Sequence, residues 1–310
     1  MKSFVVALGL ALTALAAPAT AQQVPDTSFD TRIAHPAYTT RHPRVMFDEA
    51  HHNFHKTSGR YLVFAELIRH DGYDVVPSER PFTAASLAGY EVLVIANALG
   101  NDDMSDPAAA KPAFTDAECE AVRDWVRAGG ALLLIADHVP MGSAARGLAL
   151  RFGVDMSNGV TTDTTEANNM DGNRSVLVFS RQNGLLQDHP ITLGRDSTER
   201  IRRVVAFTGQ SLEGPKGSTS FLQLSPVAVD IIAPSLQAAM SSKETRPAAG
   251  RSQGLALTAE KGRVVVLGEA AMLSAQLAGP DHRPMGMNVP GSDDRQLALN
   301  VMHWLTRVLN

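Results

Sequence analysis

Cysteine is almost absent from this chain. Among 310 residues Cys119 is the only one, and this excludes an internal disulfide. The fold must therefore be held by its hydrophobic core, which a chain of this length can bury. After the first 21 residues no apolar run is long enough to cross a bilayer, so we expect no membrane association once that segment is removed.

An excess of positive charge is also lacking. Lys2 is the only charged residue among the first 21, so the rest of the chain carries 27 basic and 32 acidic side chains, a formal charge of −5. We therefore expect no nucleic-acid partner and no anionic-lipid partner. The sequence has no Walker phosphate loop, no G-x-G-x-x-G after a strand and no G-x-S-x-G elbow. Nucleotide hydrolysis and serine-hydrolase chemistry are accordingly disfavoured.

The N-terminal segment has the three parts of a secretory signal peptide. Lys2 supplies the charged start, residues 4–17 form the apolar stretch, and Ala19-Thr20-Ala21 is a small-x-small cleavage site. An uncleaved anchor is the alternative, but the apolar stretch is short and a good cleavage site follows it. We predict that residues 1–21 are removed and that the protein is periplasmic or secreted.

The remaining chain predicts a single α/β domain. Residues 22–43 are proline-rich and indicate an extended lead-in, so the domain is expected to span residues 44–310. Strands are expected at residues 45–47, 74–76, 92–96, 131–136 and 263–267, and helices at residues 60–70, 144–152 and 293–309. A further helix is expected after Thr115, because Thr115 and Glu118 form a capping box. Because helices long enough to be crossovers separate the strands, a mostly parallel sheet covered on both faces is predicted.

The pattern changes over residues 153–250. Turn-rich sequence surrounds short strand candidates at 176–179, 204–207 and 227–232. We interpret this segment as a β-rich elaboration of the core sheet, with a small separate subdomain as the alternative. Residues 241–252 are expected to be a mobile surface loop.

Polar side chains follow four of the predicted strands. Asp48, Glu49, His51, Asn53 and His55 come after the first, Asn97 after residues 92–96, Asp137-His138 after residues 131–136, and Glu269 after residues 263–268. Ligands of open parallel sheets bind beyond the carboxyl ends of the strands. We therefore expect one site there, with Asp137, His138, Glu269 and Glu49 as catalytic acids and bases and with Asn53 and Asn97 contacting substrate.

The same segments predict a possible divalent metal site, for example for zinc. Imidazole and carboxylate groups are its usual ligands, so His51, His55 and Asp48 are the candidates. His51 and His55 have the i, i+4 spacing of zinc proteases, but His52 stands where those enzymes carry a glutamate. The alternative is that these histidines bond loop backbone. Likewise, Asp137 has the alternative role of capping the next helix, and Glu269 that of a carboxylate at a helix N-terminus.

Several segments together resemble a known superfamily. They are residues 47–51 (Phe-Asp-Glu-Ala-His), 129–138 (from Gly129-Gly130 to Asp137-His138), 189–191 (His-Pro-Ile) and 262–269 (ending in Gly268-Glu269), with Asn300 and Trp304 near the C-terminus. The chain resembles the class I glutamine amidotransferase-like superfamily, in its branch of trehalose-utilisation proteins and related gliding-motility and intraflagellar-transport domains. The resemblance covers nearly the whole chain after residue 21 and implies a flavodoxin-like sheet.

The resemblance also implies a missing activity. True amidotransferases place a nucleophilic cysteine just after the strand that matches residues 131–136, where this chain has Asp137-His138. True amidotransferases also have a motif with a histidine and a glutamate after the last strand. At that place this chain has Glu269 but no histidine. Glutamine hydrolysis through a cysteine thioester is therefore not expected, and Cys119 lies in the preceding predicted helix.

Two functions remain open. The first is a hydrolase, metal-assisted or acid/base, that acts on a small polar or carbohydrate-type substrate at the strand ends. The second is a non-catalytic module that binds a sugar or another small ligand, or docks a partner protein, in the same crevice. The density of acids beside histidines favours the hydrolase.

Overall fold

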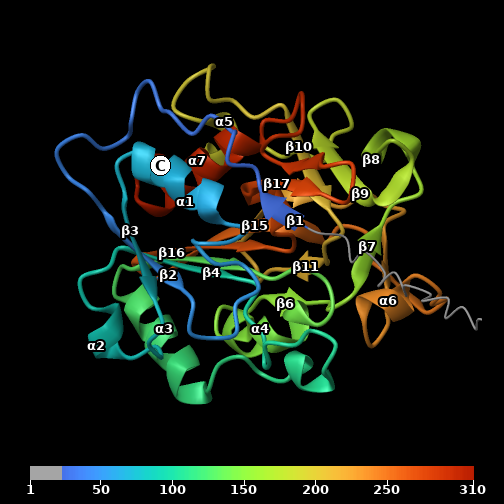
Figure 1. The fold of residues 1–310 in the computed structure, drawn as a ribbon, viewed down its shortest axis with the longest axis horizontal. Coiled ribbons are helices and arrows are strands. Elements are labelled where there is room, and N and C mark those ends of the chain that lie inside the picture. The colour runs from blue at the N-terminus through green and yellow to red at the C-terminus, as the bar shows by residue number, and fades with distance from the viewer. Residues whose placement is uncertain (1–22) are drawn as a thin grey trace, which may run out of the picture.

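The computed structural model describes residues 23–310. The expected signal peptide, residues 1–21, lies outside these described residues and stays a prediction. No helix of the described part is long and apolar enough to span a bilayer. Figure 1 shows a layered α/β molecule with a central sheet between two groups of helices.

The central sheet has nine strands. Five neighbours run parallel: β3 (Asp74–Ser78), β2 (Arg44–Asp48), β4 (Val92–Ala96), β5 (Ala131–Ile135) and β16 (Gly262–Leu267). The sheet continues with β15 (Ser252–Ala259), β11 (Leu212–Glu213) and β6 (Asp155–Met156), while β12 (Thr219–Gln223) also pairs with β15. All residues of β4 and β5 are buried, as expected for strands covered on both faces.

The sheet is mixed, whereas the sequence predicts a mostly parallel one. The strands β15 and β16 pair antiparallel, as do β11 and β12 with β15. For β15 and β16 the cause is their short connection: Glu260 and Lys261 alone join them, and a two-residue loop can join only antiparallel neighbours.

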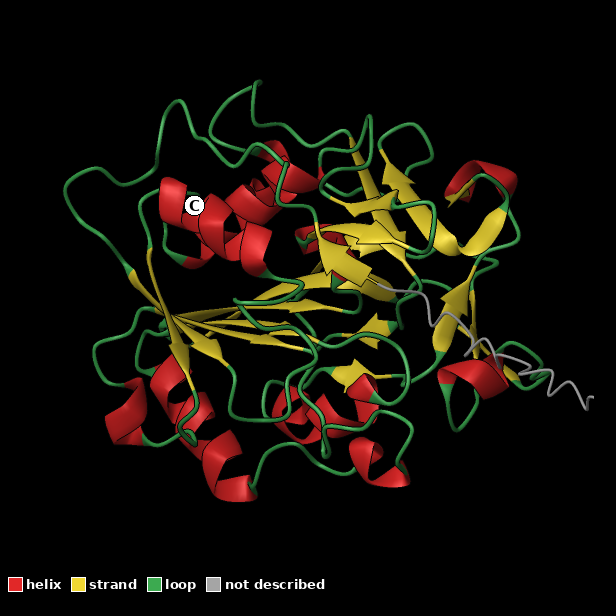
Figure 2. Cartoon of the chain, in the orientation of Figure 1, coloured by secondary structure: helices red, strands yellow, loops and turns green. Residues whose placement is uncertain are grey.

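Helices cover both faces of the sheet (Figure 2). One face carries α1 (Leu62–His70), α5 (Pro190–Leu193) and α7 (Asp294–Leu305), and the other carries α2 (Ala84–Leu87), α3 (Asp116–Arg127) and α4 (Met141–Leu150). Alternate strand residues enter separate cores: Val94 and Leu133 pack with α1 and α7, while Leu93 and Leu132 pack with α3 and α4. This alternation follows from the two-residue period of a strand.

Residues between β5 and β16 add further short elements at one end of the sheet. The structure has β7 (Val160–Thr162), β8 (Asn169–Met170), β9 (Asn173–Ser180), β10 (Arg203–Phe207), β13 (Val229–Ile231), α6 (Leu236–Ala239), β14 (Thr245–Pro247) and the 3-10 turn η2 (Glu166–Asn168), while the 3-10 turn η1 (Pro107–Ala110) precedes α3. The short strands form two three-stranded sheets, β10-β9-β8 and β14-β13-β7. Part of the expected loop 241–252 is therefore strand β14, which pairs with β13.

A third small sheet joins the start of the described chain to the segment after β16. Strand β1 (Gln23–Pro25) pairs antiparallel with β17 (Ala275–Ala278), which in turn pairs with β18 (Arg283–Gly286). The 3-10 turn η3 (Ala271–Leu273) connects β16 to this sheet. The start of the described chain thus lies beside the carboxyl end of β16, where Glu269 is located.

Candidate functional site

Asp137 is held in place by groups from two neighbouring strand ends. It follows β5, and Asn97 follows β4. The Asn97 amide donates to Asp137 Oδ2 at 2.7 Å, and the Asp137 N–H donates to Asn97 Oδ1 at 2.9 Å. The backbone N–H of Ala270 donates to Asp137 Oδ1 at 2.6 Å. These contacts fix the Asp137 carboxyl group, and they make Asn97 a positioning residue.

Glu269 provides the second acid. Its side chain is fully buried, and its two oxygens accept the N–H groups of Ala271 at 2.6 Å and Met272 at 2.8 Å. Burial, together with the neighbouring Asp137, raises the pKa of Glu269 well above its usual value, and burial also raises the pKa of Asp137. Because two interacting carboxyl groups in a poorly solvated site do not ionise together readily, the pair holds one proton over a wider pH range than free carboxyl groups do.

His138 lies next to this acid pair with a defined proton position. Its Nδ1 is 2.7 Å from the carbonyl oxygen of Val139. A carbonyl oxygen only accepts, so Nδ1 carries the hydrogen and the neutral ring keeps a lone pair on Nε2. His138 is half-buried and lines the same cavity as Asp137 and Glu269. Its Nε2 is thus suited to act as a base.

His55 and Tyr61 form a buried aromatic wall beside the acids. Their ring centroids are 4.8 Å apart, and the Tyr61 hydroxyl donates to the Ala270 carbonyl at 2.6 Å. Burial, followed by the charges of Glu269 and Asp137, raises the pKa of Tyr61 well above its usual value. Burial, with the nearby Arg60 charge, lowers the pKa of His55 to about 3. Both rings are therefore neutral near pH 7.

Asp137, His138, Glu269 and His55 line one cavity of about 190 Å³. The other lining residues are Gln23, Phe54, Met104, Met141, Phe207, Thr208, Leu236, Ala271, Gln276 and Met285. Two buried polar atoms in its walls have no hydrogen-bond partner in the described chain, namely His55 Nδ1 and Gln276 Oε1.

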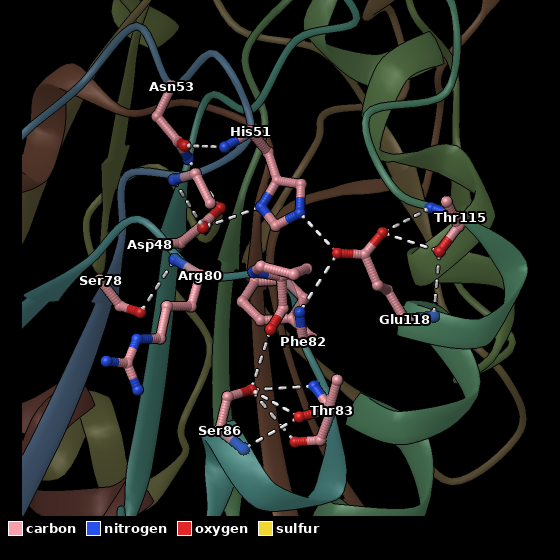
Figure 3. Close-up of polar contacts among 12 residues, drawn as sticks. Asp48, His51, Asn53, Ser78, Arg80, Phe82, Thr83, Ser86, Thr115 and Glu118 are labelled. Atoms are coloured by element: carbon pink, nitrogen blue, oxygen red, sulfur yellow. Dashed lines mark hydrogen bonds and ion pairs between the residues drawn. The ribbon is translucent and has the colours of Figure 1, made fainter.

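Figure 3 shows a second polar cluster, whose residues do not line this cavity. His51 bridges two carboxylates, with Nδ1 2.8 Å from Asp48 Oδ1 and Nε2 2.9 Å from Glu118 Oε1. The Asn53 amide donates to Asp48 Oδ2 at 2.9 Å. Burial opposes protonation of His51, but its hydrogen bonds to Asp48 and Glu118 raise its pKa. The cluster is a buried ion network that ties the loop after β2 to helix α3.

Glu118 does more than the sequence predicts for it. It forms the predicted capping box with Thr115, and its carboxylate also accepts the Phe82 N–H at 3.1 Å. Although burial opposes ionisation, these bonds and the one to His51 lower the pKa of Glu118 to about 2. Glu118 therefore stays charged and supports a positive charge on His51.

Glu49 belongs neither to the cavity lining nor to the cluster around His51. Its Oε1 accepts both the N–H of Thr57 at 2.8 Å and the hydroxyl of Thr57 at 2.7 Å. These contacts close the loop between β2 and α1. Glu49 does not line the cavity of the acid pair, and its place is explained by the fold of this loop.

The structure therefore brings together only part of the expected site. Asp137, His138, Glu269 and His55 share one cavity, with Asn97 behind Asp137. The segment after β2 turns away from that cavity at Asp48, His51 and Asn53, because Glu118 of α3 binds His51. Sequence spacing cannot give the direction in which this loop turns.

The predicted metal ligands are not arranged as a set. Both ring nitrogens of His51 are bound to carboxylates, whereas His55 lies in the other cavity. Within residues 23–310 no group of three or more His, Cys, Asp and Glu side chains is placed to hold a metal ion. The structure thus does not bring His51, His55 and Asp48 together as one ligand set, and a divalent metal cofactor stays a prediction.

Two residues of the site carry no signal in the sequence. Gln210 donates through Nε2 to the carbonyl oxygens of Ala136 and Asp137, both at 2.9 Å, and so supports the chain at the turn after β5. Gln276 lines the cavity from β17. Glutamines occur on most surfaces, and only contacts between distant segments show that these two belong to the site.

Comparison with known proteins gives the fold. No protein-family profile matches the sequence, and no curated protein matches it. Among solved structures, the mmIFT52 N-terminal domain is 14% identical and has a TM-score of 0.59, with 84% of this chain and 97% of that domain covered. A ThuA-like protein from Bacteroides uniformis is 14% identical, with 87% and 95% covered and a TM-score of 0.45. A GMP synthase-like protein from Thermoplasma acidophilum is 12% identical, with 87% and 97% covered and a TM-score of 0.45.

These identities speak for the fold alone. The mmIFT52 domain is matched over nearly its whole length. It belongs to one of the groups to which the sequence motifs point. The chain therefore shares the α/β fold of this domain, which is the fold that the resemblance implies.

Proposed function

We propose that this protein is a hydrolase that works by general acid–base catalysis in the cavity at the carboxyl ends of β5 and β16. One observation carries the proposal: the Val139 carbonyl fixes the hydrogen of His138 on Nδ1, which leaves Nε2 as a base in the same cavity as a buried acid pair. General acid–base hydrolysis requires one group that accepts a proton from water and one that donates a proton to the leaving group, and this cavity contains both.

The reaction follows from these positions. His138 Nε2 takes a proton from a water molecule, and the oxygen of that water attacks the substrate. The proton held by the pair of Asp137 and Glu269 passes to the leaving group, and the proton on His138 then returns to the carboxylate. Asn97 and Ala270 keep Asp137 in position throughout.

Variants of His138 and Asp137 test the hydrolase. Wild type, His138→Ala and Asp137→Asn are assayed with p-nitrophenyl esters, glycosides and anilides. We expect each variant to lose about 100-fold or more in kcat/KM, the usual contribution of a general acid or base. His42→Ala is the matched control, because His42 Nδ1 also lies 2.7 Å from a carbonyl oxygen, that of Gly72, on an exposed surface. Full activity of His138→Ala would end the proposal.

A binding module is the second candidate, and one observation favours it. All four oxygens of Asp137 and Glu269 already accept hydrogen bonds from the protein. Such acids can be structural, and the ligand would then meet other polar residues of the lining, among them His138 and Thr208. Binding of a small ligand without turnover of any compound in the assay would favour this candidate.

We further propose that the protein acts outside the cytoplasm, on the basis of the signal peptide expected at residues 1–21. N-terminal sequencing of the exported protein tests this proposal. The expected first residue is Gln22, and a chain that still begins at Met1 would contradict it.

A further inference from the structure

We propose that the substrate of this cavity carries a short apolar group of about six carbon atoms and no negative charge, and that it is neither a sugar nor an anion. The inference rests on the proposed function, because it assigns a substrate class to the same cavity. Three features of the lining carry it: its charge, its polarity and its volume.

The charge of the lining disfavours anionic ligands. Its ionisable side chains are Asp137, Glu269, His55 and His138, and none of the described residues that line it is Lys or Arg. Arg60, whose charge acts on His55, lies with its guanidinium carbon 4.0 Å from the centre of the Phe54 ring and is not part of the lining. While the acid pair holds one proton, it carries one negative charge. A carboxylate or phosphate group would meet that charge without a cationic partner, which is unfavourable.

Several polar groups of the lining are already engaged by the protein. All four carboxyl oxygens of Asp137 and Glu269 accept hydrogen bonds from the chain. His138 Nδ1 is bound to a backbone carbonyl, and Gln276 Nε2 donates to the Ser274 hydroxyl at 2.6 Å. A sugar would bring many hydroxyl groups into this cavity, and each one that is buried without a partner is unfavourable.

Apolar side chains form the larger part of the cavity surface. They belong to Phe54, Met104, Met141, Phe207, Leu236, Ala271 and Met285. Methionine side chains adapt to varied apolar shapes, and aromatic rings offer flat apolar faces. This part of the lining therefore suits an alkyl chain or a ring, whose burial is favourable in proportion to the area removed from water.

The volume of the cavity limits the size of that group. The cavity holds about 190 Å³. An apolar cavity of about 150 Å³ binds benzene. The space therefore accepts one ring or chain of about six carbon atoms, with little left for a second one.

Four small compounds that cannot be hydrolysed test the inference on the chain that begins at Gln22. They are cyclohexanol, cyclobutanol, cyclohexanecarboxylate and inositol, and NMR of the methionine methyl groups measures their binding. Cyclohexanol should bind at least about 10-fold more tightly than cyclobutanol, because each buried methylene group contributes about 4-fold. Inositol has the ring of cyclohexanol with a hydroxyl group on every carbon, and cyclohexanecarboxylate adds a negative charge. Each should bind at least about 10-fold more weakly than cyclohexanol.

The positions of the methionines make the measurement specific for this cavity. Met104, Met141 and Met285 line it, so their methyl signals should shift when cyclohexanol binds. The signal of Met240, which is 88% exposed and not part of the lining, should stay unchanged. Absence of cyclohexanol binding, or equal binding of inositol or cyclohexanecarboxylate, would overturn the inference. Binding that leaves the three lining methionines unchanged would overturn it as well.

A matched pair of variants tests the role of charge. Leu236→Lys adds a positive charge to the lining at a side chain that is 37% exposed. We expect it to strengthen binding of cyclohexanecarboxylate relative to cyclohexanol by about 3-fold, as an exposed ion pair does. Leu193→Lys is the control, because Leu193 is 36% exposed and does not line the cavity. An equal change in both variants, or no change in Leu236→Lys, would contradict the assignment.

The result also distinguishes the two proposals. If cyclohexanol binds as expected but wild type hydrolyses no compound, the hydrolase fails and the ligand class stands. If hydrolysis depends on His138 while inositol or cyclohexanecarboxylate binds as tightly as cyclohexanol, the substrate class fails and the hydrolase stands.

Discussion

At the scale of single residues, His51 is the clearest case of a charge sustained by its surroundings. It is buried, yet both ring nitrogens meet carboxylates that the fold keeps in place. Removing one partner of such a network leaves the other charge buried without compensation, which usually costs about 3–5 kcal/mol. The network therefore contributes to stability only while His51 carries its proton.

This dependence gives a pH prediction. The pKa of His51 is raised in the folded protein, so its contribution is fully present below about pH 6.5, the unfolded value, and is lost as the pH rises through the folded pKa. The free energy of unfolding of His51→Gln should be lower than that of wild type by about 3–5 kcal/mol at pH 6, and the difference should shrink at alkaline pH. Urea unfolding at several pH values measures it. His52→Gln, a change at an exposed neighbour, should match wild type throughout.

His55 predicts the opposite behaviour. Burial, with the Arg60 charge, lowers its pKa to about 3, so the unfolded chain binds its proton more readily than the folded protein does. Stability is therefore lost as the pH falls from about 6.5 towards 3, by at most about 5 kcal/mol. His55→Phe, which keeps a ring against Phe54 and Tyr61, should flatten this loss in acid unfolding curves. An unchanged slope below pH 6.5 would show that His55 is not the titrating group.

At the scale of elements, the turn after β16 decides where Glu269 points. Gly268 precedes that residue, and a Cβ on Gly268 would lie 2.3 Å from the Gln210 carbonyl oxygen. Backbone cannot move aside as a flexible side chain does, so the strand end and the Gln210 segment would have to separate. The close approach of these two backbones is thus a requirement of the site.

Gly268→Ala tests this requirement. We expect a loss of about 1–3 kcal/mol in stability, typical of overpacking, and a loss of activity or ligand binding larger than the stability change explains. Thermal unfolding and kcat/KM with the p-nitrophenyl compounds measure the two effects. Gly59→Ala is the control, because the nearest atom to its Cβ is 3.7 Å away. If Gly268→Ala hydrolyses these compounds and unfolds as Gly59→Ala does, the close approach has no role.

The elements also show which parts of this protein can be predicted from its sequence. Strand 92–96 and the capping box before α3 are predicted correctly, because a buried apolar run and a cap are local patterns. Helix α4 begins at Met141 and not at residue 144, since its first three residues carry little periodicity. The acids at the ends of β5 and β16 can be found because parallel strands deliver their ends to one edge.

The parts that could not be predicted depend on contacts between distant segments. The antiparallel half of the sheet arises from pairings of short strands whose partners have no local signature. His51 and Glu118 lie 67 residues apart in the chain, and only their contact shows that the loop after β2 serves the fold. The walls of the cavity likewise combine Gln23, Met104, Leu236 and Met285, which no motif connects.

At the scale of the whole molecule, the described N-terminal segment completes the cavity from the opposite end of the chain. In β1, Gln23 and Val24 pair with Ala278 and Leu277 of β17, while Pro25 lies opposite Gln276. The Asp26 N–H donates to the Ala275 carbonyl at 2.9 Å, and the Asn288 amide donates to Asp26 at 3.0 Å. The strand that carries Gln276 is therefore held between β1 and β18.

This arrangement predicts the effect of shortening the chain. A protein that begins at Phe29 lacks β1 and Asp26, so one edge of β17 loses its hydrogen bonds and Gln276 loses part of its support. Compared with the chain that begins at Gln22, we expect a midpoint of thermal unfolding lower by about 2–4 °C for each kcal/mol lost, and a lower kcat/KM with the p-nitrophenyl compounds. Gln23→Ala removes only a lining side chain and keeps the strand, so it should retain the unfolding midpoint. If the shortened protein hydrolyses these compounds as the longer one does, Gln276 is positioned by β18 alone, and the N-terminal segment has no part in the site.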